Sequence, residues 1–195
     1  MPRIVKPSIL DIGCGTGVPT MLLARLSAGQ ITAVDIERSK LERLEEKVKK
    51  ANFSEQIKVM HRSMFEFKFP EQSFDIVWSE GSIAAIGFTR GIKEWYRLIK
   101  PQGFLVVHDM TDSVVQKLEY VGRYGYSLLD HFTIPGEIWW SEYYEPLGKA
   151  IERLRNEHHN NDSLLAQLDK EELEVEKVKA DPGSYSSTFF ILQKT

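Results

Sequence analysis

The stretch Asp11-Ile12-Gly13-Cys14-Gly15-Thr16-Gly17 joins a short apolar run to a longer amphipathic one. Residues 8–12 read as a buried strand, and Pro19 suits the first turn of the helix that follows. Glycines at such a junction let a ligand approach the backbone, because no side chain stands in the way. We therefore predict a ligand-binding loop at 11–17.

Two common nucleotide-binding loops fit this stretch poorly. A dinucleotide fingerprint needs a third glycine or an alanine at position 18, whereas Val18 stands there and Gly17 comes one residue early. A phosphate-binding P-loop needs Gly-Lys-Ser/Thr after the glycines, and the chain lacks it. The spacing disfavours both NAD binding and a phosphate-cradling loop.

An acidic residue, Asp35, ends the second expected strand at 31–35. A carboxylate in this position can accept hydrogen bonds from both hydroxyls of a ribose. The alternative is that Asp35 caps the next helix, expected at 37–52. Because Asp35 occurs together with the glycine loop, we expect a ligand that contains a nucleoside.

The rest of the chain alternates short β-branched or aromatic runs with amphipathic stretches, which indicates an α/β fold with crossover helices. Further strands are expected at 57–60, 74–78, 104–108, 126–129 and 187–192. Pro101 and Gly103 are expected to end a helix and turn the chain. Residues 135–183 form a long helical insertion between the last two strands, and insertions of this length are usually functional.

Composition excludes several classes of partner. The chain has 195 residues, enough for one domain, and its 28 acidic residues outnumber 25 basic ones. With a net charge of -3 we expect no nucleic acid and no membrane as partner. Apolar runs are shorter than the roughly 20 residues that span a bilayer. The single cysteine and the lack of a signal peptide favour a cytoplasmic protein.

The stretch 11–17 resembles motif I of the class I S-adenosylmethionine-dependent methyltransferases, and Asp35 matches the ribose-binding acid of that family. The resemblance covers nearly the whole chain, including 74–78 and the turn at 98–104. It implies one domain over 1–195 with a Rossmann-like, seven-stranded, mostly parallel sheet flanked by helices. It also implies S-adenosyl-L-methionine as cofactor and residues 135–183 as a helical lid.

Segments 78–83, 86–88 and 139–147 further resemble a branch of small bacterial and archaeal members that act on small molecules. The implied partner is a small-molecule methyl acceptor, and a homodimer stays open. The resemblance also assigns cofactor contacts to the loop, to the ends of three strands and to the segment after the third strand. These residues are Asp11, Gly13, Cys14, Gly15, Gly17, Asp35, Ile36, Ser63, Met64, Ser79 and Glu80.

Family members often carry Asp where this chain has Ser63, so backbone groups of Met64 would share the recognition of adenine. Glu80 and His108 follow the fourth and fifth strands and are the candidate catalytic bases. Glu80 has an alternative role as an acceptor for the cofactor's amino group. His108 has an alternative structural role. We predict no metal, because Cys14 is alone and an acidic cluster is missing.

Aromatic residues gather at the start of the insertion. His131, Trp139 and Tyr143 are the candidate acceptor pocket, where aromatic rings could hold an apolar or cationic substrate. Trp140, Tyr144 and Leu147 have helical spacing, which favours the buried face of a lid helix.

Two rival functions stay open. The family usually carries helices before the first strand, and this chain starts that strand by Pro7, which would suit a non-catalytic S-adenosylmethionine sensor or partner subunit. A nucleotide-dependent oxidoreductase is the second rival, and Val18 disfavours it.

Overall fold

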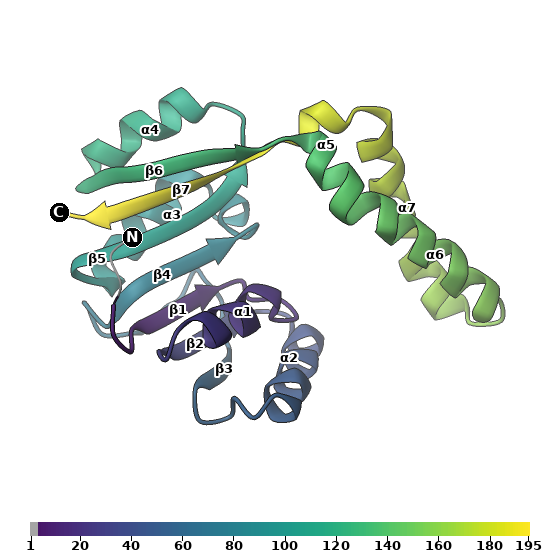
Figure 1. The fold of residues 1–195 in the computed structure, drawn as a ribbon, viewed down its shortest axis with the longest axis horizontal. Helices are drawn as coiled ribbons and strands as arrows, with labels where there is room; N and C mark the ends of the chain where they lie inside the picture. Colours follow the sequence, from purple (N-terminus) through teal and green to yellow (C-terminus); the bar gives the residue numbers. More distant parts are fainter. Residues whose placement is uncertain (1–3) are drawn as a thin grey trace. The chain divides into compact units, whose positions relative to one another are not determined.

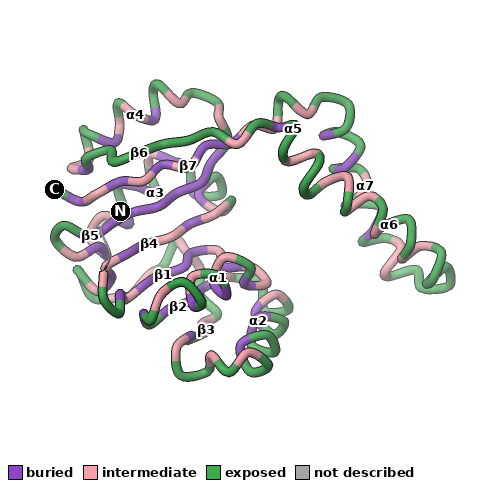
Figure 2. Tube along the Cα trace, in the orientation of Figure 1, coloured by how far each residue is buried: buried purple, intermediate pink, exposed green. Residues whose placement is uncertain are grey.

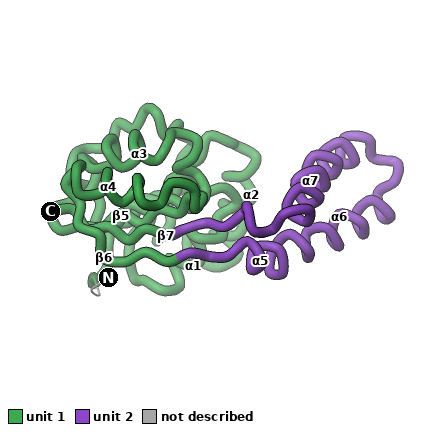
Figure 3. Tube along the Cα trace, turned by 90° about the horizontal axis from the view of Figure 1, so that it is seen from above, with its two compact units in different colours: residues 1–132, 189–195 green, residues 133–188 purple. Residues whose placement is uncertain are grey.

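The computed structural model describes residues 4–195 and divides them into two compact units (Figure 3). The first unit holds the described residues up to Phe132 together with Phe189–Thr195, and the second holds Thr133–Thr188. The second unit extends a few residues beyond each end of the expected insertion at 135–183. Among residues 4–195, no helix is long and apolar enough to cross a membrane.

One sheet of seven strands runs through the first unit in the order β3-β2-β1-β4-β5-β7-β6 (Figure 1). The strands are β1 Ser8–Ile12, β2 Gln30–Asp35, β3 Ile57–His61, β4 Phe74–Glu80, β5 Ile99–Met110, β6 Tyr126–Ile134 and β7 Ser187–Lys194. The four pairs from β3 to β5 are parallel, and β7 runs against its neighbours in Figure 1. The predicted Rossmann-like, mostly parallel sheet is confirmed.

Helices cover the sheet on two faces, because neighbouring residues of each strand point to opposite sides. The helices of this unit are α1 Val18–Leu26, α2 Arg38–Lys50, α3 Phe88–Trp95 and α4 Val114–Arg123. Ile9 of β1 packs in the core beneath α1 and α2, while Leu10 packs in the core beneath α3 and α4. Figure 2 shows the buried central strands between these layers.

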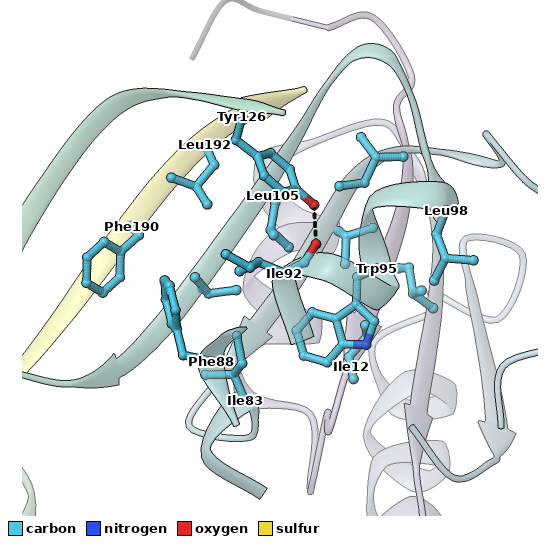
Figure 4. Packing of buried hydrophobic residues seen from close by; sticks show 14 of the residues in the cluster. Ile12, Ile83, Phe88, Ile92, Trp95, Leu98, Leu105, Tyr126, Phe190 and Leu192 are labelled. Atoms are coloured by element: carbon cyan, nitrogen blue, oxygen red, sulfur yellow. Dashed lines mark hydrogen bonds between the residues drawn. The ribbon is translucent and has the colours of Figure 1, made fainter. Parts of the chain in front are cut away.

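The core beneath α3 is the larger one and includes residues from both ends of the chain. Phe190 of β7 packs with Ile92 and Trp95 of α3, and the Tyr126 hydroxyl donates a hydrogen bond of 2.9 Å to the Ile92 carbonyl (Figure 4). On the other face, Leu41, Leu44 and Val48 of α2 are buried, as their spacing predicts. Both layers hold the ends of β1, β2 and β4 in fixed positions.

The connection from α3 to the fifth strand differs from the prediction. The helix ends at Trp95, a 3-10 turn η2 (Tyr96–Leu98) follows, and β5 already begins at Ile99. Pro101 and Gly103 therefore lie inside the strand and do not turn the chain before it. Gln102 adopts a φ of 61°, and the pairing with β4 shifts register at this point. The strand absorbs the Pro-Gly stretch as a local irregularity.

The second unit is helical and has its own small core. It contains α5 Gly136–Trp139, a π-helical turn η3 (Trp140–Tyr144), α6 Glu145–Glu157, α7 Asp162–Ala180 and a short 3-10 turn η4 (Pro182–Tyr185). Its buried centre consists of Ile151, Leu168 and Val175, against which Trp140, Tyr144 and Leu147 pack. The expectation that these last three form the buried face of a helix is confirmed.

The turn between α6 and α7 falls at 158–160. Asn161 caps α7, and its side chain accepts a hydrogen bond of 3.1 Å from the Leu164 amide. The neighbouring candidates for a cap, Asp162 and Ser163, lie inside the first turn of the helix. Asn, Asp and Ser have similar capping preference, so composition cannot choose among adjacent candidates.

Candidate functional site

The glycine loop takes a conformation that only glycine adopts easily at three positions. Gly13, Gly15 and Gly17 have φ angles of 70°, 54° and 82°. A Cβ on Gly13 would collide with Ser82, and one on Gly17 would collide with Leu44, while one on Gly15 would meet no atom within 4 Å. Gly13 and Gly17 therefore allow close packing, and Gly15 borders open space.

The carboxylate of Asp35 joins this loop to the end of β2. Its Oδ2 accepts a hydrogen bond of 2.8 Å from the Gly15 amide, and its Oδ1 accepts one of 2.8 Å from the Glu37 amide. A carboxylate has about four acceptor positions, so about two remain for a ligand. The alternative interpretation, that Asp35 caps the next helix, is also supported in part. The Glu37 amide that donates to Asp35 belongs to the residue directly before the first turn of α2.

The segment after β4 closes the site from the opposite side. The Ser82 hydroxyl donates a hydrogen bond of 2.6 Å to the Ile12 carbonyl and shares one of 2.7 Å with the Ser79 hydroxyl. Ser82 then leads into a 3-10 turn η1 (Ile83–Ala85). This link fixes the end of β4, and with it Glu80, beside the glycine loop.

These segments surround a cavity of about 350 Å³ at the carboxyl ends of β1, β2 and β4. The strand order reverses between β1 and β4, which is the place where open α/β sheets bind ligands. The cavity is lined by Gly13, Gly15, Val34, Asp35, Ile36, Glu37, Lys40, Arg62, Ser63, Met64, Phe65, Glu80, Gly81, Ser82 and Ala85. Its volume lies at the lower end of the range, about 300–1,000 Å³, of small-ligand pockets.

Seven residues with a predicted cofactor contact line this cavity together. They are Gly13, Gly15, Asp35, Ile36, Ser63, Met64 and Glu80. The other four, Asp11, Cys14, Gly17 and Ser79, are not among the lining residues. Asp11, Cys14 and Ser79 are buried, so their side chains support the loop and the strand ends from behind.

Asp11 has the most perturbed environment of these supporting groups. It is 1% exposed, and its Oδ2 accepts a hydrogen bond of 2.5 Å from the Thr20 hydroxyl. Burial raises the pKa of Asp11 to about 7, the Thr20 hydrogen bond opposes this, and the nearby carboxylates of Glu80 and Asp35 add to it. Asp11 thus lies buried beneath the loop, and its contact with the cofactor stays a prediction.

The two candidate bases differ in position. Glu80 lines the cavity, and burial raises its pKa. A weak hydrogen bond of 3.4 Å from the Trp78 indole lowers the pKa and partly opposes this effect. His108 pairs with Glu80 across β4 and β5 but does not line the cavity. The His108 ring stacks on Phe189 with centroids 4.5 Å apart. Burial lowers the pKa of His108, and the charge of Asp109 partly opposes this by raising it.

The three candidate acceptor-pocket residues fall in different parts of the chain. His131 lies on β6 in the first unit, where its ring stacks on Phe190 with centroids 6.4 Å apart. Trp139 and Tyr143 lie in the second unit, with centroids 6.3 Å apart at right angles. The Trp139 indole donates a hydrogen bond of 2.7 Å to Ser187. Their role in binding an acceptor stays a prediction.

The sequence analysis missed two cations, Lys40 and Arg62, that line the cavity. Phe65, in the segment expected to flank the adenine, adds an aromatic ring, and Gly81 and Ser82 form the wall after β4. Gly81 has a φ of 70°, so the Gly-Ser pair directly after Glu80 was the available signal for a tight turn there. Lys40 and Arg62 carried no local signal, since charged surface residues are common.

Comparison with known proteins agrees with this geometry. Residues 9–103, which contain the glycine loop and the ends of β1, β2 and β4, match the family described as "Methyltransferase domain". The match, which covers just under half of the chain, and the fold together support the class I S-adenosylmethionine-dependent methyltransferases as the family that the chain resembles. The predicted resemblance is thereby confirmed.

One curated relative of the chain is 27-O-demethylrifamycin SV methyltransferase of Amycolatopsis mediterranei (strain S699), 28% identical over 110 residues. The match covers 56% of this chain and 40% of the relative, so the chain matches well under half of that protein's length.

Two solved structures share the methyltransferase fold over almost the whole chain. A SAM-dependent methyltransferase from Geobacter sulfurreducens in complex with S-adenosyl-L-homocysteine is 14% identical, with a TM-score of 0.79 over 99% of this chain and 86% of that one. The cyclase SpnF is 19% identical, with a TM-score of 0.80 over 97% of this chain and 75% of that one. At these identities the likeness concerns the fold.

Proposed function

We propose that the protein binds S-adenosyl-L-methionine in the cavity at the glycine loop and transfers its methyl group to a small-molecule acceptor. The observation that carries the proposal is the convergence of Gly15, Asp35 and Glu80 on one cavity at the switch point of the sheet. The Geobacter sulfurreducens neighbour, which holds S-adenosyl-L-homocysteine, has the same fold and supports this choice of ligand.

The lining residues suit the parts of this ligand. Asp35 keeps acceptor positions for ribose hydroxyls, and Ile36, with 63% of its surface exposed, offers an apolar side chain to the adenine ring. The open space at Gly15 would receive the methionine part against the backbone. Ser63 and Met64 lie on the same wall and are proposed to contact the edge of the adenine.

S-adenosyl-L-methionine supplies, when bound, a sulfonium methyl group that an acceptor attacks in line, leaving S-adenosyl-L-homocysteine. The residues of the chain then need only align the two reactants and exclude water. Glu80 is proposed to accept a hydrogen bond from the amino group of the ligand or to remove a proton from the acceptor. His108 is the second candidate base, and burial favours its neutral, proton-accepting form.

A titration calorimeter tests the ligand directly. Wild-type protein is titrated with S-adenosyl-L-methionine and S-adenosyl-L-homocysteine, with NAD as the control ligand. We expect saturable binding of S-adenosyl-L-methionine and S-adenosyl-L-homocysteine to the wild type. Asp35→Ala should lose this binding, and the matched variant Asp130→Ala, on the exposed part of β6, should retain it. Binding of NAD alone would favour an oxidoreductase.

Turnover separates the enzyme from its main rival. Formation of S-adenosyl-L-homocysteine that depends on an added small-molecule pool is expected, followed by mass spectrometry of the acceptor. The rival is a sensor or partner subunit that binds S-adenosyl-L-methionine without turnover. The structural likeness to a cyclase leaves this rival open, because the fold is not restricted to methyl transfer. Binding without turnover across a broad pool would support the rival.

A further inference from the structure

A second and larger cavity lies in the first unit, beside the cavity at the glycine loop. It measures about 670 Å³ and is bounded by residues 64–68 of the connection between β3 and β4 and by residues 93–98 of α3 and η2. Met64 and Phe65 line both cavities, so the connection is a wall with a hollow on each side. The proposed function assigns no role to this second cavity.

The floor of the second cavity includes Trp95, whose indole nitrogen has no hydrogen-bond acceptor in the described part of the chain. Trp95 is 1% exposed, and Nε1 is itself buried. In Figure 4 this nitrogen lies on the side of the ring turned away from Tyr126. A buried indole N–H usually finds a partner, and leaving one without a partner carries an energetic cost. An acceptor atom from a ligand would remove this cost.

The charged side chains around the cavity are mostly cationic. Lys68, Lys93 and Arg97 line it together with Glu66 and Glu94. Glu94 is already neutralised by Arg90, whose Nε lies 2.6 Å from its Oε1. Lys68 and Lys93 form no ion pair with any residue of the described range 4–195. The remaining charge therefore favours an anion.

Arg97 gives the cavity a fixed wall. Its guanidinium donates hydrogen bonds of 2.6 Å and 3.0 Å to the backbone carbonyls of Phe67 and Phe69. The connection between β3 and β4 is thus held to η2 at this point, and the hollow is supported by the fold. Apolar surface comes from Met64, Phe67 and Leu98.

We propose that this cavity is a second ligand site, for a small organic anion with a flat apolar body. The body would lie against Met64, Phe67 and Leu98, and the anionic group would face Lys68 and Lys93 with the Trp95 N–H as a further donor. The site is independent of whether the first cavity binds S-adenosyl-L-methionine.

The test follows the Trp95 indole N–H by nitrogen-15 NMR of the full chain. The protein has four tryptophans, and Trp95→Phe identifies the Trp95 signal. The probe is naphthalene-2-carboxylate, and the matched neutral control is naphthalene-2-carboxamide. We expect a saturable shift of the Trp95 signal with the carboxylate and a clearly weaker response to the carboxamide.

Charge removal provides the second arm. Because each exposed ion pair contributes only modestly to binding, the double variant Lys68→Gln/Lys93→Gln should raise the dissociation constant of the probe about fivefold. Lys170→Gln, an exposed lysine of α7 in the second unit, should leave it unchanged. The other three indole signals report that each variant is folded.

Three results would overturn the proposal. They are an unmoved Trp95 signal at millimolar probe, equal affinity for the carboxylate and the carboxamide, and equal affinity of wild type and the double lysine variant. None of these measurements uses S-adenosyl-L-methionine, so a failure here leaves the proposed function untouched.

Discussion

The backbone amide of Gly15 donates a hydrogen bond of 2.8 Å to Oδ2 of Asp35. The residue proposed to bind ribose therefore also holds the glycine loop against the end of β2. Loop geometry and nucleoside binding share one carboxylate, and substitutions at Asp35 should affect both.

Asp35→Asn is expected to weaken binding of S-adenosyl-L-homocysteine by about tenfold or more. The amide keeps one acceptor oxygen for the Gly15 amide but replaces the other with a donor, and hydrogen bonds to charged groups are worth about 1.5–3 kcal/mol. Calorimetry gives the affinity, with Asp130→Asn as the matched exposed control. Unchanged affinity in Asp35→Asn would remove this residue from the proposed site.

Alanine at two glycines of the loop should lower stability to different extents. Gly13→Ala is expected to destabilise the fold by about 2–4 kcal/mol, because the added methyl group collides with Ser82 at a positive φ. Gly15→Ala meets open space, so it should lose only about 1–2 kcal/mol from backbone strain while weakening ligand binding. Thermal unfolding and calorimetry on both variants separate the effects. Equal loss of stability would contradict this assignment.

Stability should fall with rising pH because of Asp11. Its pKa is raised to about 7 in the folded state, so between the ordinary carboxyl range near 4 and pH 7 the folded protein binds a proton that the unfolded chain releases. The stabilisation is complete below that window and is lost as pH rises through about 7, with a slope of up to about 1.4 kcal/mol per pH unit.

Asp11→Asn cannot ionise and keeps an acceptor for Thr20. Its stability relative to wild type should therefore increase between pH 5 and pH 8, read from urea unfolding at each pH. A constant difference across this range would mean that Asp11 is ionised throughout.

Glu80→Gln distinguishes the two roles proposed for this carboxylate. We expect weaker binding of S-adenosyl-L-homocysteine, by about tenfold, because a charged acceptor on the cavity wall is replaced by a neutral one. Calorimetry with wild type and Glu80→Gln provides the comparison. Normal affinity together with a loss of turnover of about a hundredfold or more would instead assign Glu80 as general base.

Local patterns in the sequence were enough to find the centre of the site. Glycines between a strand and a helix, and an acid at the end of the next strand, can each be recognised from a few neighbouring residues, and both line the same cavity. Strand and helix positions followed from apolar spacing in the same way, since one face of each element is buried.

Contacts between distant segments could not be predicted in this way. The link from Ser82 to Ile12 joins residues 70 positions apart, and it explains why Gly13 must lack a side chain. Asp11 was assigned to the cofactor because it belongs to the motif, yet it lies buried beneath the loop. Depth within a fold depends on packing of the whole chain, which a short motif does not encode.

The second unit begins and ends at neighbouring points. The hydroxyls of Thr133 and Thr188, its first and last residues, lie 3.1 Å apart. A two-residue turn could join β6 to β7 in its place, because antiparallel neighbours need no longer connection. The second unit can therefore be exchanged for another segment without altering the strand order that builds the glycine-loop cavity. Its length and composition can vary between relatives, and the unit can be replaced in engineered chains.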